Sequence, residues 1–321
     1  MTSADVRDCS SCVDIVVPMG NVNCGLDAGS VEKSRPPCCP ADSIGYLAPS
    51  ASYEEKGVVE TLIGGLQCYV AETSAATKGV IIVAYDIFGF TAGRTRQICD
   101  ELAAQGFTVL LPDFFRGGGG NPDVWVPFAV PSMIRSIKAT RWEQVAVDLE
   151  AVVSRGAELG GASAAAGSDS AVSVGFVGFC WGGWVAARAC ASGLFDRSDV
   201  TVVGAALVHP SLRVEGMAGS GLSELDIATD ARCPMLLLPS ASEPASVKEG
   251  GSFTTALAAK HPATKAKTYG GMKHGWVPRG DLRHAAVQRA ASDAMAEIVA
   301  FFNARCGVAA AADAGADAVA A

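Results

Sequence analysis

Charged residues are scarce in this chain, and basic residues are scarcer than acidic ones. Only 18% of the 321 residues are Asp, Glu, Lys or Arg, and 25 Lys and Arg stand against 33 Asp and Glu, a formal net charge of −8. A nucleic-acid surface needs clustered basic side chains, and the sequence has no such cluster. We therefore expect a small-molecule partner and no nucleic acid.

Long apolar runs are also missing. Residues 1–20 lack the basic start and the continuous apolar core of a secretory signal, and no apolar run reaches the length of a membrane-spanning helix. We expect a cytoplasmic protein with no membrane partner. The 11 cysteines are odd in number, and without a signal peptide most of them are expected to be reduced thiols.

The two ends of the chain have little apolar periodicity. We expect a flexible N-terminal segment at residues 1–40, a single domain at residues 41–306 and a low-complexity Ala/Asp tail at residues 307–321. A zinc site at Cys9, Cys12 and the cysteines that follow is an alternative for the first segment. It lacks a second clean Cys-x-x-Cys pair and any histidine, so we expect no metal.

Hydrophobic residues make up 50% of the chain and gather in short runs of Val, Ile and Leu. These runs predict strands at residues 57–63, 66–71, 79–85, 107–113, 172–178, 202–209, 235–240 and 266–270. Helices are expected at residues 94–106, at 141–159, after Cys180, and in a last segment ending near Phe302. This alternation predicts an α/β fold, with a mostly parallel central sheet flanked by helices on both faces. Sites in such folds lie at the carboxyl ends of strands.

One of these strands runs into the segment Gly-Phe-Cys-Trp-Gly-Gly, with Cys180 at the turn. A strand, a sharp turn and a helix form a nucleophile elbow, in which neighbouring glycines relieve crowding. A helix N-terminus also stabilises a thiolate. The segment does not spell the dinucleotide fingerprint G-x-G-x-x-G, and the remaining alternative is an ordinary buried cysteine. The context predicts that Cys180 is a nucleophile.

A thiol nucleophile needs a base, and the chain has four histidines. His274 lies in a glycine-containing loop between the last predicted strand and the last predicted helix. In chains with a nucleophile elbow, the nucleophile comes first, the acid second and the base last, so the base is expected in this region. His284 falls within the predicted last helix, His261 precedes a proline at a helix end, and His209 is expected to be a structural hydrogen-bonding group. The sequence therefore favours His274 as the base.

An acid is needed to orient the imidazole and to stabilise its protonated form. The acids between the strand at residues 235–240 and His274 are Glu243 and Glu249. Glu243 follows the strand end directly and is the first candidate, while Glu249 is the alternative.

These residues resemble the dienelactone hydrolase family, also called carboxymethylenebutenolidases. The similarity extends from about Cys38 to Phe302, through CCPADSIGY, GGLQCYVA, YDIFGFTAGRTRQICDELAAQGFTVLLPDFF, GFVGFCWGGW, LVHPS and KHGW. The resemblance implies an α/β-hydrolase fold with a Cys–Asp–His triad that acts on lactones and related esters, without metal or organic cofactor.

Carried over residue by residue, the resemblance implies catalytic roles for Cys180, His274, Glu243 and Asp86. Glu243 takes a position that usually holds Asp, and Asp86 takes that of a carboxylate that is usually Glu and contacts the resting thiol. Each departure changes the reach of the carboxylate by one methylene, in opposite senses.

The resemblance also implies an oxyanion hole and a substrate pocket. The backbone N–H groups of Ile87 and Trp181 match the oxyanion donors. Arg116 and Arg279 are the nearest equivalents of two arginines that hold a substrate carboxylate, and solvated arginines are the alternative. The aromatic side chains that could line an apolar pocket are Phe115, Trp125, Trp181 and Trp276.

The sequence thus predicts a cysteine-nucleophile hydrolase that cleaves a lactone or small activated ester through a thioester. A non-catalytic α/β-hydrolase scaffold that binds a ligand or a partner is the alternative. A thiol redox sensor would need a resolving cysteine near Cys180, and Cys190 lies about 15 Å along the following helix.

Overall fold

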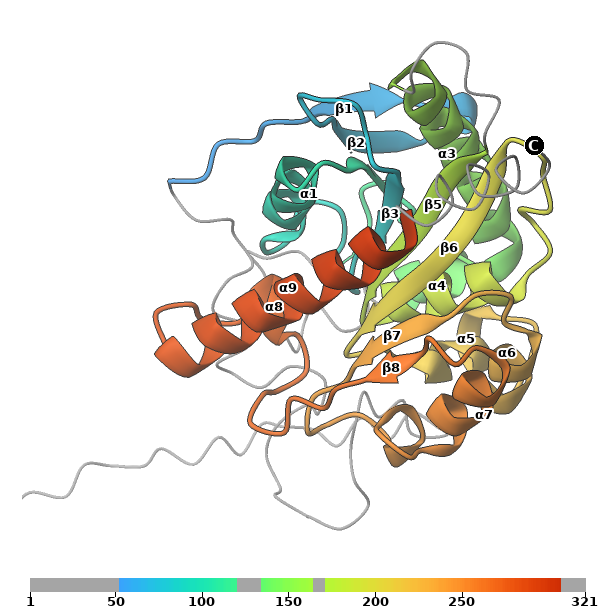
Figure 1. The fold of residues 1–321 in the computed structure, drawn as a ribbon, viewed down its shortest axis with the longest axis vertical. Helices are drawn as coiled ribbons and strands as arrows, with labels where there is room; N and C mark the ends of the chain where they lie inside the picture. Colours follow the sequence, from blue (N-terminus) through green and yellow to red (C-terminus); the bar gives the residue numbers. More distant parts are fainter. Residues whose placement is uncertain (1–51, 120–133, 164–170, 307–321) are drawn as a thin grey trace, which may run out of the picture.

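The structure, a computed structural model, describes residues 52–119, 134–163 and 171–306. The terminal segments expected at residues 1–40 and 307–321, the alternative zinc site and Trp125 lie outside these ranges. Within them, eight strands form one sheet in the order β1-β2-β4-β3-β5-β6-β7-β8 (Figure 1).

The sheet is mostly parallel, as predicted. Its strands are β1 (Val58–Thr61), β2 (Gln67–Ala71), β3 (Val80–Ala84), β4 (Thr108–Pro112), β5 (Val172–Phe179), β6 (Val200–Val208), β7 (Met235–Leu238) and β8 (Lys265–Ala266). Strand β2 pairs antiparallel with β1 and with β4, and every other neighbouring pair is parallel. All residues of β3, β4 and β7 are buried, because helices cover both faces of a parallel sheet.

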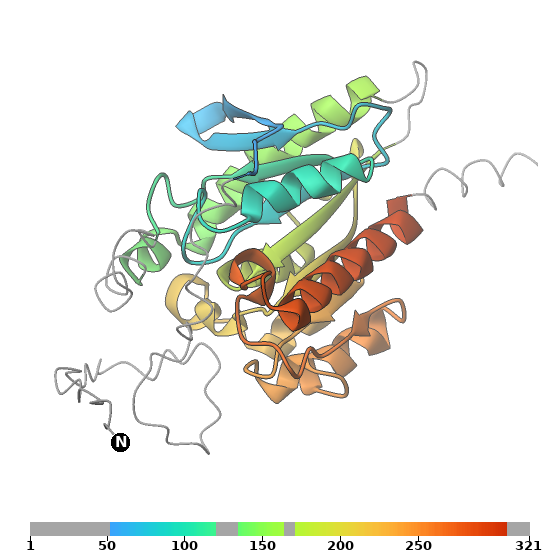
Figure 2. The same ribbon diagram turned by 90° about the vertical axis from the view of Figure 1, so that its left-hand side faces the viewer.

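Helices lie on both faces of the sheet. They are α1 (Thr95–Ala104), α3 (Trp142–Ser163), α4 (Trp181–Ala191), α5 (Glu215–Ala218), α6 (Glu224–Asp230), α7 (Ser252–Lys260), α8 (Trp276–Arg279) and α9 (Ala285–Cys306), and residues 134–139 are also helical. Helices α1 and α9 cover one face, and α3 and α4 cover the other (Figures 1 and 2). No helix in the described ranges is long and apolar enough to cross a bilayer.

The chain after β7 departs from the sequence prediction. The strand expected at residues 266–270 is regular only at Lys265–Ala266. Beyond it, Lys267 and Tyr269 still donate to the Leu237 and Pro239 carbonyls over 2.9 and 2.8 Å, and a single parallel bridge joins Ser240 and Tyr269. His284 stands one residue before α9 rather than inside it. The short helix α8, which was not predicted, begins two residues after His274.

The carboxyl ends of five adjacent strands meet at one edge of the sheet. Asp86 follows β3, Cys180 follows β5, His209 follows β6, Glu243 follows β7 and His274 follows β8. Because β3, β5, β6, β7 and β8 are consecutive neighbours in the sheet, residues that are far apart in the sequence come together at this edge.

Candidate active site

The turn at Cys180 is a strained elbow between β5 and α4. Cys180 has φ 54° and ψ −111°, a conformation that side chains other than glycine rarely adopt. A Cβ atom on Gly178 would overlap the Gly182 carbonyl, and one on Gly182 would overlap the Ala84 carbonyl at the end of β3. The glycines beside Cys180 therefore allow α4 to begin directly against the sheet.

The Cys180 side chain is buried, with 1% of its surface exposed. Its Sγ lies 3.4 Å from the Oγ of Ser211, and either atom could be the donor. The Ser211 N–H also donates to the Cys180 carbonyl over 2.9 Å. Sequence reasoning missed Ser211, although it ends the LVHPS motif quoted for the family resemblance.

His274 and Glu243 form a buried hydrogen-bonded pair. The distance between His274 Nδ1 and Glu243 Oε1 is 2.6 Å, and each side chain is 2% exposed. Glu243 also accepts the Ser240 N–H through its second oxygen. Glu249, the alternative acid, binds the backbone and hydroxyl of Thr268 instead.

Cys180 and Glu243, the two proposed partners of His274, both affect its pKa. Burial alone would lower the pKa of His274, but the Cys180 thiol and the Glu243 carboxylate outweigh it and raise this pKa well above its ordinary value. Burial alone would raise the pKa of Glu243, but hydrogen bonding to His274 and to Ser240 lowers it below the ordinary 4.5. His274 Nε2 is buried and has no hydrogen-bond partner among the described residues, so it is the nitrogen available for proton transfer.

His209 packs against His274 and was expected to be a hydrogen-bonding group. That expectation is wrong for the described part of the chain, where neither of its ring nitrogens has a hydrogen-bond partner. Its ring lies edge to face with those of His274 and Trp276, with centroid distances of 4.6 and 5.3 Å. Burial, together with the charges of His274 and Arg279, holds the pKa of His209 well below its ordinary value. His209 is therefore a neutral packing surface behind the base.

Asp86 has partners other than the thiol. Its Oδ2 accepts the Arg279 Nε–H, and its Oδ1 accepts the Phe88 N–H over 2.9 Å. The Arg279 guanidinium lies 4.3 Å from the centre of the Phe88 ring, and both charged side chains are almost fully buried. Asp86 therefore takes part in a buried ion pair, and the contact with the resting thiol that the resemblance implies stays a prediction.

The two amides expected to form an oxyanion hole lie at adjacent strand ends. Trp181 is the first residue of α4, so its backbone N–H has no hydrogen-bond acceptor within the helix. Ile87 lies in the turn after β3, next to the amides of Phe88 and Gly89, which donate to Asp86. The Gly182 N–H donates to the Tyr85 carbonyl over 3.0 Å and fixes the helix start to this turn. Two amides at neighbouring strand ends suit a developing oxyanion.

The expected substrate residues have other contacts. Arg116 makes a two-pronged ion pair with Asp148, with both N–O distances 2.8 Å. Phe115 packs on Trp181, with ring centroids 4.6 Å apart, while Trp276 is buried behind His209. Arg279 is 1% exposed and pairs with Asp86, so each of the two arginines is bound to an acid of the chain.

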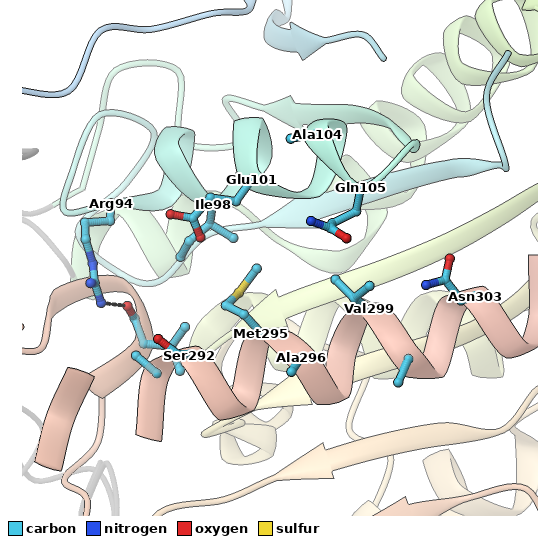
Figure 3. Close-up of a pocket in the computed structure, with 13 residues that line it drawn as sticks. Arg94, Ile98, Glu101, Ala104, Gln105, Ser292, Met295, Ala296, Val299 and Asn303 are labelled. Atoms are coloured by element: carbon cyan, nitrogen blue, oxygen red, sulfur yellow. Dashed lines mark hydrogen bonds between the residues drawn. The ribbon is translucent and has the colours of Figure 1, made fainter. Parts of the chain in front are cut away.

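A groove of about 650 Å³ lies elsewhere, between α1 and α9 (Figure 3). The Arg94 side chain at its end donates to the Val277 carbonyl, and the Arg94 N–H donates to the Pro278 carbonyl over 2.8 Å. Neither Cys180 nor His274 lines this groove. In the described ranges, no group of three or more His, Cys, Asp or Glu side chains is arranged to hold a metal ion.

Comparisons with known proteins identify the family of this chain. The model of the dienelactone hydrolase family matches residues 66–306. An uncharacterised AIM2 family protein of Schizosaccharomyces pombe is 28% identical over 83% of this chain and 98% of its own. A carboxymethylenebutenolidase homolog of Rattus norvegicus is 28% identical over 52% of this chain and 61% of its own.

Solved structures share the fold. A putative dienelactone hydrolase from Klebsiella pneumoniae superposes with a TM-score of 0.55 and 21% identity, over 77% of this chain and 98% of its own. This likeness confirms the predicted α/β-hydrolase fold.

Proposed function

This chain belongs to the dienelactone hydrolase family and is a carboxylic ester or lactone hydrolase, and from this premise we propose that Cys180 is its nucleophile. The observation that carries the proposal is the hydrogen bond between His274 and Glu243 beside Cys180. Cys180 first, and then Glu243, raise the pKa of His274. A base held in one tautomer next to a thiol is the arrangement that activates a cysteine.

In the first step, the Cys180 thiolate attacks the carbonyl carbon of the lactone or ester, and a C–S bond forms. The tetrahedral oxyanion accepts hydrogen bonds from the backbone N–H groups of Ile87 and Trp181. When the oxyanion collapses, the C–O bond to the leaving alcohol breaks, and protonated His274 gives its Nε2 proton to the alkoxide. A thioester on Cys180 remains.

In the second step, neutral His274 takes a proton from water, and the resulting hydroxide attacks the thioester carbonyl. The C–S bond breaks, the acid leaves and the thiolate is restored beside the imidazolium. Glu243 stays ionised throughout and stabilises the positive charge on His274, in keeping with its lowered pKa.

Hydrolysis of dienelactone and of p-nitrophenyl acetate tests this proposal. Cys180→Ala should abolish turnover while the protein stays folded, because no other group takes the acyl chain. Ser192→Ala, at the far end of α4, serves as the matched control and should keep the wild-type rate. Undiminished turnover by folded Cys180→Ala protein would remove the proposal.

We also propose that the acyl part of the substrate needs no carboxylate. Both candidate arginines are engaged by acids of the chain, Arg116 by Asp148 and Arg279 by Asp86. A panel of lactones with and without a carboxylate should show less than about a tenfold preference in kcat/KM between them. That factor corresponds to about 1.4 kcal/mol of binding free energy. A strong preference for carboxylates that Arg116→Ala abolishes would contradict this substrate class.

A cytoplasmic location is part of the proposal. The six cysteines in the described ranges are free thiols, which suits a reducing compartment. Cell fractionation with an antibody against the native protein tests the location.

A further inference from the structure

We infer that Ser211 is a second catalytic residue at the nucleophile, whose hydroxyl donates a hydrogen bond to the Cys180 thiolate. This inference rests on the proposed function, because it concerns the reacting sulfur of the same site. The Ser211 Oγ lies 3.4 Å from the Cys180 Sγ, within the range of a hydrogen bond to sulfur.

Ser211 is tied to Cys180 through its backbone as well as its side chain. Its N–H donates to the Cys180 carbonyl over 2.9 Å, so the two residues hold each other across the ends of β5 and β6. The preceding Pro210 packs against the first turn of α4, where a Cβ on Gly183 would lie 2.8 Å from the Pro210 Cα. The backbone of Ser211 is therefore fixed relative to the elbow, within reach of a hydrogen bond between its hydroxyl and the sulfur.

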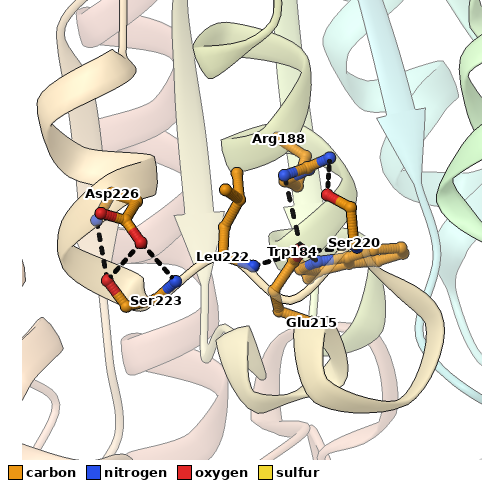
Figure 4. Close-up of polar contacts among 7 residues, drawn as sticks. All are labelled: Trp184, Arg188, Glu215, Ser220, Leu222, Ser223 and Asp226. Carbon is orange, nitrogen blue, oxygen red and sulfur yellow. Dashed lines mark hydrogen bonds and ion pairs between the residues drawn. The ribbon is translucent and has the colours of Figure 1, made fainter.

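The chain after Ser211 is fastened to α4, the helix that Cys180 begins (Figure 4). Buried Glu215 accepts the indole N–H of Trp184 over 2.6 Å and pairs with Arg188 at 3.5 Å. The same carboxylate accepts the Ser220 N–H over 2.9 Å. This network holds the segment from Ser211 to Ser220 against α4.

The chemistry of the sulfur decides the direction of the hydrogen bond. A thiolate can only accept, so the Ser211 hydroxyl must donate to it. A donor to the charged form favours that form. Once Cys180 is acylated, the negative charge is gone and this donor loses most of its effect. The donor acts again only when the C–S bond breaks and the thiolate returns. Because hydroxide attacks the thioester carbonyl before that, we expect Ser211 to affect acylation more than hydrolysis of the thioester.

Alkylation of Cys180 by iodoacetamide, followed against pH by mass spectrometry of the Cys180 peptide, reports the thiolate directly. Ser211→Val and Ser211→Thr are a matched pair of nearly equal size that differ in the hydroxyl. The half-maximal alkylation rate should move to higher pH by about one unit in Ser211→Val, since a hydrogen bond to a charged group is worth roughly a tenfold change in population. Ser211→Thr should stay close to wild type.

Hydrolysis separates the two steps. Ser211→Val should lower kcat/KM roughly tenfold for an ester whose acylation is limiting, while single-turnover deacylation changes less than about twofold. Ser211→Ala repeats both measurements with a smaller side chain, and circular dichroism shows which variants are folded. Ser192→Ala should match wild type in both assays.

Failure of this inference is distinct from failure of the proposed function. An unshifted alkylation profile in folded Ser211→Val and Ser211→Ala would overturn the role of the hydroxyl, whatever Cys180→Ala does. An acyl group found on Ser211 instead of Cys180 would overturn it too, because the serine would then be the nucleophile. Turnover by Cys180→Ala would remove the proposed function, while the alkylation result would still report the Ser211 contact.

Discussion

At the scale of single residues, the site depends on side chains whose protonation is set by their neighbours. His274 is held between a thiol and a carboxylate, while His209 packs on its ring without a hydrogen-bond partner in the described ranges. The two imidazoles have opposite pKa shifts, since His274 has partners for a positive charge and His209 has none. One histidine thus carries the proton and the other stays neutral behind it.

Glu243→Gln should weaken the fold in a pH-dependent way. The pKa of Glu243 is lowered in the folded protein, so its charged form contributes stability above the ordinary value of 4.5, and this contribution is lost as the pH falls through the lowered folded value. In urea denaturation at neutral pH, the wild type should therefore be more stable than Glu243→Gln. This difference should shrink as the pH falls below 4.5. Glu54→Gln, at an exposed position, reports the loss of one charge alone. An advantage that grows on acidification would contradict this assignment.

Residue types and chain order predicted where Cys180, His274 and Glu243 stand, because each follows a recognisable strand end. The structure brings these three together as expected, while their catalytic roles stay proposals. Ser211 was missed, since its contact joins residues 31 apart in sequence and no local pattern encodes it. The partner of Asp86 was missed for the same reason, with 193 residues separating it from Arg279.

At the scale of elements, α4 approaches the end of β3 so closely that Gly182 has no room for a side chain. Gly182→Ala should destabilise the protein by about 1–3 kcal/mol or more, because its Cβ would overlap the Ala84 carbonyl and lie 2.7 Å from the Tyr85 carbonyl. Gly216→Ala in α5 is the matched control, with no atom within 4 Å of its added Cβ. Urea denaturation of both variants measures the difference. Equal stabilities would show that α4 can shift without loss.

The principal strands and helices could be predicted because their apolar periods are long and regular. The exceptions are short. The helices α5 and α8 have four residues each and α6 has seven, so they contain about two turns of pattern or less, and β8 has only two residues of regular strand. Such features are decided by tertiary contacts, which outweigh local preference in segments of this length.

At the scale of the whole molecule, the segment from Gly270 to Gly280 crosses the carboxyl edge of the sheet, from β8 to the turn after β3. We call it the histidine strap, because it carries His274. Its far end is fastened to that turn by the Asp86–Arg279 ion pair and to the start of α1 by Arg94.

Removing one partner of the Asp86–Arg279 ion pair should cost the protein more stability than replacing both partners. Asp86→Ala leaves a buried guanidinium and should cost about 3–5 kcal/mol. The Asp86→Ala/Arg279→Leu protein should lose less than the sum of the two single changes, because neither charge is then left alone. A double-mutant cycle in urea measures this coupling. Additive losses would show that the two side chains do not interact.

The near end of the strap is held differently. Strand β8 is the edge strand and pairs with β7 through Lys265 and Ala266, and backbone hydrogen bonds from Lys267 and Tyr269 to Leu237 and Pro239 extend this pairing. Local opening at this edge would carry the base away from the sulfur while the central strands stay hydrogen-bonded. We therefore expect the amides of β8 to exchange with solvent before those of β5. The working lifetime of the enzyme on warming should accordingly follow the detachment of one edge strand rather than the melting of the sheet.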